Sequence, residues 1–146
     1  MDEICTYGSL DRVVKEKLSS LIESAFQKVL VSDYFEEPLE KVIILGDYKA
    51  AAILKPFGDW HYLDKFAVQK EFQGNGIGKQ LLNHLVEHYS PLFWRAKKDN
   101  PFNKNYQLVA PSVECGKWFV YSVGMSPSPD ILQYAMTKRE TLKNIS

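Results

Sequence analysis

Three glycines at alternate positions mark the stretch of this sequence best suited to chemistry. Gly74, Gly76 and Gly78 follow an apolar run at residues 62–68 and precede apolar residues with helical spacing. Glycine lets a backbone approach a ligand closely, and the N–H groups and dipole of a helix N-terminus attract anions. We therefore expect this turn to bind a pyrophosphate. Its residues are Gln73, Gly74, Asn75, Gly76, Ile77 and Gly78.

The spacing does not fit other glycine-rich phosphate loops. A P-loop requires Gly, four residues and then Gly-Lys-Ser/Thr, but Gln73 lies where the first glycine belongs and Gln80 follows Lys79. A dinucleotide-binding loop requires a sixth-position glycine, which is Lys79 here. A kinase glycine loop lies between antiparallel strands and needs further motifs that this sequence lacks. A purely structural glycine turn remains the alternative.

Basic side chains recur at the ends of the elements expected near this loop. Strand alternation places Arg95 and Lys97 on one face of the strand that contains them. Lys65 follows Asp64 within an apolar strand, where a charge is costly to bury unless it is paired or functional. Lys28 projects near the apolar face of a helix end. The alternatives to a binding site are a solvated basic strand end, a mutual Asp64–Lys65 pair and a lysine that extends to solvent.

The spacing of apolar residues predicts the elements that position these side chains. Helices are expected from Ser9 or Asp11 to about Leu30, over residues 77–89 and over residues 102–109. Strands are expected at residues 42–45, 48–54, 61–68, 92–97, 117–125 and 131–136. Gly46-Asp47 is expected to form a two-residue hairpin turn, and residues 56–59 a loop. This order predicts a mixed sheet with helices packed on it, and a flexible tail from about residue 138.

The composition is that of an ordinary soluble globular domain. The chain has 146 residues, 45% of them hydrophobic, and a formal net charge of zero, so a nucleic-acid partner is not expected. Two cysteines and a His84/His88 pair form no disulfide framework or zinc motif, so no metal is expected. The acidic start and the lack of a long apolar segment predict neither a targeting peptide nor a membrane partner.

The glycine loop and the element order together resemble those of the GNAT superfamily of N-acetyltransferases. A narrower resemblance, over about residues 19–121, is to the acetyltransferase domain of vertebrate- and fungal-type N-acetylglutamate synthases. Its most specific residues are the run from Phe93 to Lys97, then Asn100-Pro101, then Tyr106. Asn105 and Gln107 replace the aromatic residues that usually flank this tyrosine.

The resemblance implies an enzyme with a GNAT fold, a single α/β (α+β mixed) domain over residues 1–146 with a mostly antiparallel central sheet. It implies direct attack of the L-glutamate amine on the thioester of acetyl-CoA, a reaction of arginine biosynthesis, without a metal. The residues implied to bind acetyl-CoA are Phe66, Val68, Gln73, Gly74, Asn75, Gly76, Ile77, Gly78 and Lys79. The residues implied to bind glutamate are Lys28, Lys65, Arg95, Lys97 and Asn100.

Two catalytic roles follow from the same resemblance. A backbone N–H near Val68, where the strand is expected to bulge, stabilises the oxyanion of the tetrahedral intermediate. Tyr106 protonates the leaving thiolate, with a core aromatic residue as the alternative for this position.

The resemblance also bears on partners and location. A homodimer is compatible with it, as is an acetylglutamate kinase-like partner or fused domain. The expected location is cytoplasmic, or the mitochondrial matrix for a domain excised from a eukaryotic parent chain. Two alternatives stay open: a GNAT enzyme acting on another small amine or amino acid, and a non-catalytic domain that binds acetyl-CoA or acetylglutamate and regulates a kinase.

Overall fold

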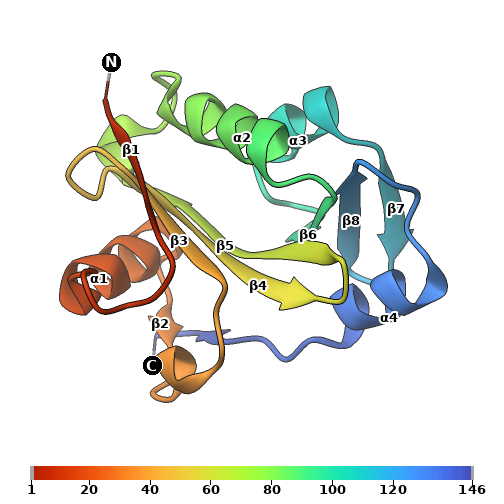
Figure 1. Ribbon diagram of the computed structural model, residues 1–146, viewed down its shortest axis with the longest axis horizontal. Coiled ribbons are helices and arrows are strands. Elements are labelled where there is room, and N and C mark those ends of the chain that lie inside the picture. Colours follow the sequence, from red (N-terminus) through yellow and green to blue (C-terminus); the bar gives the residue numbers. More distant parts are fainter. Residues whose placement is uncertain (1, 146) are drawn as a thin grey trace.

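A seven-stranded sheet forms the centre of the computed structural model, which describes residues 2–145 (Figure 1). The strand order is β1-β3-β4-β5-β6-β8-β7. The strand bounds are β1 Ile4–Tyr7, β3 Lys41–Leu45, β4 Ala50–Phe57, β5 Trp60–Val68, β6 Leu92–Lys97, β7 Ser112–Cys115 and β8 Trp118–Val123. Neighbouring strands are antiparallel except β5 and β6, which are parallel. The expected mixed, mostly antiparallel sheet is confirmed.

Helices cover both faces of the sheet, as Figure 1 shows. Their bounds are α1 Lys15–Phe26, α2 Ile77–His88, α3 Asn103–Val109 and α4 Pro129–Thr137. Leu81 and Leu85 of α2 join Tyr106 of α3 in one buried cluster. Leu18 of α1 and Ile131 of α4 belong to two further clusters, which lie against the other side of the sheet. The two faces are called the α2/α3 face and the α1/α4 face below.

An extra residue in β5 breaks the alternation of side chains. The pairing with β4 shifts register at Asp64, which is therefore a β-bulge. As a result, the consecutive residues Asp64 and Lys65 both reach Tyr34 on the α1/α4 face, whereas Leu63 packs on the α2/α3 face. The bulge expected near Val68 was wrong in position, because Val68 pairs with β4 without a register shift.

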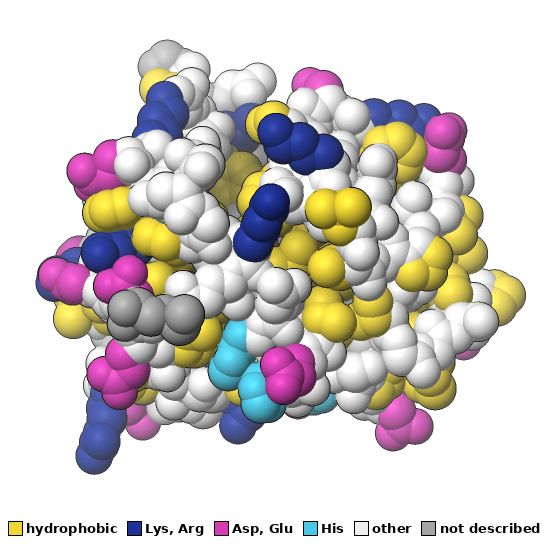
Figure 2. All heavy atoms as spheres, turned by 90° about the horizontal axis from the view of Figure 1, so that it is seen from above, with side chains coloured by type: hydrophobic (Ala, Val, Ile, Leu, Met, Phe, Trp, Pro, Cys, Tyr) yellow, Lys and Arg dark blue, Asp and Glu magenta, His cyan; other side chains and the backbone are white. Residues whose placement is uncertain are grey.

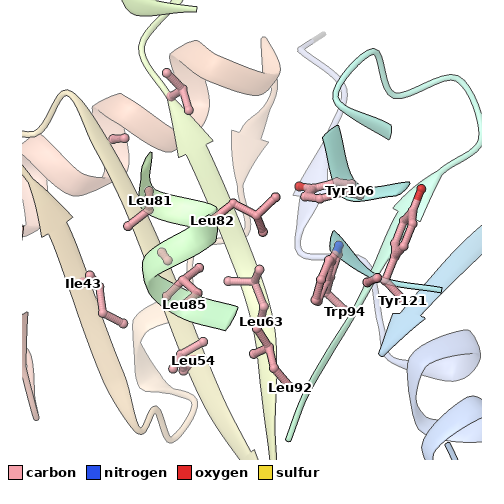
Figure 3. Packing of buried hydrophobic residues seen from close by; sticks show 14 of the residues in the cluster. Ile43, Leu54, Leu63, Leu81, Leu82, Leu85, Leu92, Trp94, Tyr106 and Tyr121 are labelled. Atoms are coloured by element: carbon pink, nitrogen blue, oxygen red, sulfur yellow. The ribbon is translucent and has the colours of Figure 1, made fainter. Parts of the chain in front are cut away.

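The parallel strands β5 and β6 pair over a short distance and then separate. Pairing joins residues 61–62 of β5 to residues 92–93 of β6, although β5 continues to Val68 and β6 to Lys97. Figure 3 shows the separation opening between α2 and Tyr106 on the α2/α3 face. The sheet is thus split next to the glycine loop, which follows the free end of β5.

The first helix covers residues 15–26 rather than the expected span from about residue 9 to about residue 30. It starts late because Val14 has an extended backbone, and the N–H group of Val14 donates to the Tyr48 hydroxyl at 2.8 Å. It ends early because Gln27 takes a left-handed conformation with φ 53°. Apolar periodicity alone continued across both boundaries.

Residues 131–136 were expected to form a strand and instead lie in α4, so that prediction was wrong. The Ser128 hydroxyl accepts a hydrogen bond from the Ile131 N–H at 3.4 Å, and Pro129 occupies the first helical position. Ile131 and Ala135, one turn apart, are both buried. Helical spacing, and not alternation, therefore directs this segment to the core.

Two edge strands and two turns also differ from the sequence prediction. The strands β1 and β7 were not anticipated, and both are short. The turn expected at Gly46-Asp47 spans residues 46–49, with positive φ at its glycine and at Tyr48. The loop expected at residues 56–59 is shorter, because β4 extends to Phe57.

The C-terminal tail, expected to be flexible from about residue 138, runs back across the α1/α4 face (Figure 1). Strand β9 (Leu142–Lys143) pairs antiparallel with β2 (Val29–Leu30). The N–H group of Val31 donates to the Thr141 carbonyl at 2.9 Å. Residues 141–143 therefore lie beside the residues that follow α1.

Candidate active site

Gly74 and Gly76 give the loop before α2 its backbone shape. Their φ angles are 89° and 91°, a left-handed conformation that residues with side chains rarely adopt. A Cβ atom at either position would have nothing within 4 Å. Gly76 has no side chain to cap α2, so the N–H groups of the first turn have no partner within the helix. The loop can therefore offer backbone donors to an anion.

Gly78 is required for packing as well. A Cβ atom there would lie 2.9 Å from the ring of Phe102 and 3.4 Å from Val68. The ring of Phe102 is thus pressed against the first turn of α2. The Cα of Gly78 faces this ring, and the N–H group of Gly78 is the part of the residue that could donate to a ligand.

The other loop residues are exposed, apart from Ile77, which is 8% exposed and packs in the core. Gln73 donates from Nε2 to the Val68 carbonyl at 2.9 Å and so ties the loop to the end of β5. Asn75 and Lys79 are exposed. Lys79 adds a positive charge to the first turn of α2.

An aromatic group lines the α2/α3 side of the separation between β5 and β6. The ring centroids of Phe66, Phe102 and Tyr106 lie 5.0, 5.3 and 6.1 Å apart. Tyr106 also packs edge-on against Trp94 at 5.3 Å (Figure 3). Burial raises the pKa of Tyr106 far above its ordinary value, so the phenol keeps its proton at neutral pH. Within residues 2–145, the buried Nε1 of Trp94 has no hydrogen-bond partner.

Lys65 lies in a buried charge cluster on the α1/α4 face. Its ammonium donates to the Thr141 hydroxyl at 2.7 Å and to Asp64 at 3.2 Å, and the residue is 8% exposed. Asp64 also accepts from the Tyr34 hydroxyl at 2.6 Å and lies 3.7 Å from Lys55. Burial would raise the pKa of Asp64, but Lys65 and Lys55 together lower it below its ordinary value. Lys65 must therefore exchange a partner before it can bind an acceptor.

Arg95 and Lys97 share the α1/α4 face of β6, as alternation predicted. The Arg95 guanidinium lies 4.0 Å from the centroid of the Trp118 ring. It donates to the carbonyls of Ala135 and Lys138, at 3.0 and 2.6 Å, at the C-terminal end of α4. A cation is favourable there, since the helix dipole is negative at that end. Arg95 thus has a structural role in holding α4.

Three lysines from different parts of the chain gather around Glu140. The Glu140 carboxylate lies 2.8 Å from the Lys117 ammonium and 3.6 Å from that of Lys97. Lys28 lies against Lys97, whose ammonium is the main cause of a lowered pKa at Lys28. Sequence reasoning did not single out Lys117, which lies in the turn between β7 and β8, where no periodicity marks a direction. The structure thus brings Lys28, Lys97 and Lys117 into one cationic cluster.

Two asparagines shape the approach to α3. The Asn100 side chain accepts from the Phe102 N–H at 2.8 Å. Asn103, which sequence reasoning missed, donates to the Lys97 carbonyl at 2.9 Å and accepts from the Tyr121 hydroxyl at 2.9 Å. This buried amide fixes α3 to the end of β6. Nothing in its polar sequence context distinguished it from its neighbours.

The predicted site residues therefore form two groups on opposite faces of the sheet. The glycine loop, Val68, Phe66 and Tyr106 lie on the α2/α3 side. Lys65, Arg95, Lys97 and Lys28 lie on the α1/α4 side. The two groups adjoin where β5 and β6 separate. A ligand that reaches through the split sheet would contact both.

The α2/α3 face seen in Figure 2 has mixed character, with basic side chains standing among apolar and acidic ones. The His84 and His88 rings lie 4.4 Å apart on α2. Over residues 2–145, no group of three or more His, Cys, Asp or Glu side chains is placed to hold a metal ion. No described helix is long and apolar enough to span a membrane.

The fold is that of the GNAT acetyltransferases. The ribosomal-protein-S18-alanine N-acetyltransferase of Escherichia coli aligns with a TM-score of 0.65 at 17% identity, covering 88% of this chain and 98% of that chain. A putative GNAT-family acetyltransferase of Bacteroides thetaiotaomicron aligns with a TM-score of 0.64 at 16% identity, covering 86% of this chain and 88% of that chain. The PaiA N-acetyltransferase of Thermoplasma acidophilum, solved with coenzyme A, gives 0.60 at 13% identity, covering 84% and 99%. Such identities establish the architecture alone.

Sequence comparison narrows this class. The family model described as NAT, the N-acetyltransferase of N-acetylglutamate synthase, matches residues 5–143. The chain therefore belongs to this NAT family, and the resemblance drawn from the sequence is confirmed.

Curated relatives of the chain carry two different names. The mitochondrial N-acetylglutamate synthase of Danio rerio is 32% identical over 155 residues, which cover 99% of this chain and 29% of that protein. A protein of Xylella fastidiosa (strain Temecula1) named acetylglutamate kinase is 40% identical over 91 residues, covering 62% of this chain and 22% of that protein. The chain spans 22–34% of the length of the first curated relatives it matches.

Proposed function

We propose that this chain transfers the acetyl group of acetyl-CoA to the amine of L-glutamate. The observation that supports this most directly is the arrangement around β5 and β6. A loop with free backbone donors lies on one side of the separated strands, and cations able to pair with carboxylates gather on the other. An activated acyl donor and a dianionic acceptor would meet between them.

Acetyl-CoA fits the α2/α3 side. Its diphosphate would accept hydrogen bonds from the N–H groups of residues 74–79, with Lys79 adding positive charge. The open space next to Gly74 and Gly76 leaves room for the phosphates. The N–H of Gln69 donates to the Lys49 carbonyl on the β4 side, so alternation turns the N–H of Val68 toward the separation. That donor is suited to a developing oxyanion.

The reaction would proceed by direct attack. The neutral amine of glutamate forms the new C–N bond at the thioester carbon, and the C–S bond then breaks. The Tyr106 phenol, protonated and next to Phe66, gives its proton to the leaving thiolate. The surplus proton of the amine passes through water and restores the phenol. Asp64 is engaged by Tyr34 and two lysines, so it is not assigned the role of base.

The acceptor carboxylates would be held on the α1/α4 side. Arg95 suits bidentate binding of a carboxylate once its hydrogen bonds to the carbonyls of Ala135 and Lys138 are exchanged, whereas lysines act as compact point charges. Lys28 and Lys97 already lie together there, and Lys65 lies buried nearby on β5. Asn100 would approach the acetamide oxygen or a carboxylate once its turn contact to Phe102 is exchanged.

A thiol-release assay with an amino-acid panel tests this proposal. The chain is incubated with acetyl-CoA and, separately, glutamate, glutamine, aspartate and the amine-free dicarboxylate glutarate. We expect saturable release of free thiol with glutamate, and a kcat/KM for glutamine about 10- to 100-fold lower, because a charged hydrogen bond contributes about 1.5–3 kcal/mol. Equal rates with glutamate and glutamine would contradict glutamate as the acceptor.

A second function is supported by the relatives named acetylglutamate kinase, which contain a segment similar to this chain. A chain that binds acetyl-CoA or acetylglutamate without turnover would act as a regulatory domain of a fused or separately bound kinase. The same assay separates the two, since ligand binding without thiol release favours the regulatory function. For a eukaryotic parent chain, the name of the Danio rerio relative favours the mitochondrial matrix.

A further inference from the structure

The short segment that follows α4 contacts most of the cations proposed to hold the acceptor. Arg95 donates to the Lys138 carbonyl at 2.6 Å. Lys65 donates to the Thr141 hydroxyl at 2.7 Å, and Lys97 pairs with Glu140 at 3.6 Å. We call residues 138–143 the C-terminal strap.

The strap is fastened at both ends and crosses the α1/α4 face between them (Figure 1). At its start, Arg139 pairs with Glu37 at 2.6 Å and with Asp33 at 3.1 Å. At its end, residues 142–143 pair with β2. Glu140 lies between these anchors and is directed at the lysines rather than at the anchoring carboxylates.

Glu140 supplies the carboxylate of the lysine cluster. One of its oxygens lies 2.8 Å from Lys117 and the other 3.6 Å from Lys97. Its pKa is lowered, first by the hydrogen bond from Lys117 and then by the charges of Lys117, Lys97 and Arg95. The side chains of Glu140 and Lys97 are 42% and 41% exposed, so water and solutes reach the pair. Exposed pairs of this kind are weak and are readily exchanged.

We propose that Glu140 occupies the position that a carboxylate of the acceptor takes, so that the strap competes with the substrate for the Lys28/Lys97/Lys117 cluster. This rests on the proposed function, because it takes Lys28 and Lys97, two of these lysines, as part of the acceptor site. The chemical basis is identity of the competing groups: the side chain of Glu140 ends in the same carboxylate as the side chain of free glutamate. Bound glutamate displaces Glu140, and the strap moves with it.

The test is Glu140→Gln, which keeps the size of the side chain and removes its charge. We expect the KM for glutamate to fall about two- to tenfold, the range that loss of two exposed competing pairs allows. The KM for acetyl-CoA should not follow it. Binding of glutarate, measured by calorimetry in the presence of coenzyme A, should tighten by a similar factor.

Glu114→Gln is the matched control. Glu114 pairs with Lys98 at 3.0 Å on the neighbouring strand β7 and lies outside the cluster. Its substitution removes the same charge from another exposed pair with a lysine, so it reports the general effect of charge on dicarboxylate binding. The proposal requires a larger change for Glu140→Gln than for Glu114→Gln.

The outcomes distinguish this proposal from the proposed function. Unchanged or weaker glutarate binding in Glu140→Gln overturns competition by the strap, even if the chain acetylates glutamate. Tighter glutarate binding supports competition even if no amino acid is acetylated, in which case only the assigned acceptor fails. Thermal unfolding of both variants verifies that each remains folded.

Discussion

At the scale of single residues, the charges of β5 show how position decides role. Asp64 and Lys65 are consecutive, yet the bulge sends both side chains to the α1/α4 face, where they bond to each other. Each also has a further partner, Tyr34 for Asp64 and Thr141 for Lys65. The mutual pair, one of the alternatives drawn from the sequence, is therefore present. A role for Lys65 in acceptor binding stays a prediction.

Tyr106 provides the sharpest test at this scale. Tyr106→Phe keeps the ring that packs against Trp94 and Phe102 and removes only the hydroxyl. We expect kcat to fall about 10²- to 10⁴-fold, the usual contribution of a general acid, with little change in the KM values. Steady-state kinetics with unfolding as a control measures this. An unchanged kcat would remove Tyr106 as the proton donor.

At the scale of elements, the loop and the start of α2 require glycine for two different reasons. Gly74 and Gly76 supply backbone angles that expose N–H groups, and Gly78 supplies room for a neighbouring ring. The alternating glycines in the sequence predicted the unusual backbone angles. The packing requirement at Gly78 depends on Phe102, which belongs to a different segment, so no local pattern revealed it.

Gly78→Ala tests this packing. The new methyl group would meet the Phe102 ring at 2.9 Å, and overpacking of this kind costs about 1–3 kcal/mol of the free energy of unfolding. Phe102→Leu in the same chain should recover part of that loss, because the smaller side chain vacates the contact. Chemical denaturation of the two single variants and the double variant measures the coupling. Additive losses would show that the ring does not limit this position.

At the scale of the whole molecule, Glu37 joins three distant parts of the chain. It pairs with Lys55 of β4 at 2.8 Å and, after α4, with Lys138 at 2.9 Å and Arg139 at 2.6 Å. Burial would raise the pKa of Glu37, but these three cations lower it to about 2. The strap is thereby held to the first half of the domain.

This lowered pKa predicts a pH dependence of stability. The unfolded chain takes up a proton at Glu37 near pH 4.5, whereas the folded chain does so only near pH 2. The contribution of Glu37 to the free energy of unfolding is therefore fully present above about pH 4.5. It is lost as the pH falls toward 2, by up to about 3 kcal/mol. Chemical denaturation at pH 7 and pH 3 measures this. Between these pH values, the free energy of unfolding should fall less in Glu37→Gln than in the unaltered chain. Equal losses would mean that Glu37 titrates normally.

The sequence by itself determined the features that depend on neighbouring residues. Alternating glycines located the turn before α2, alternation in β6 placed Arg95 and Lys97 on one face, and helical spacing located α2 and α3. Each of these follows from the fixed periods of strands and helices, which are properties of local backbone geometry.

Only the tertiary structure decided which distant groups meet. It paired Lys65 with Thr141, 76 positions away, and placed Lys117 and Glu140 beside Lys97. Such contacts are set by the packing of complete elements, and they leave no periodic trace in the sequence around either partner.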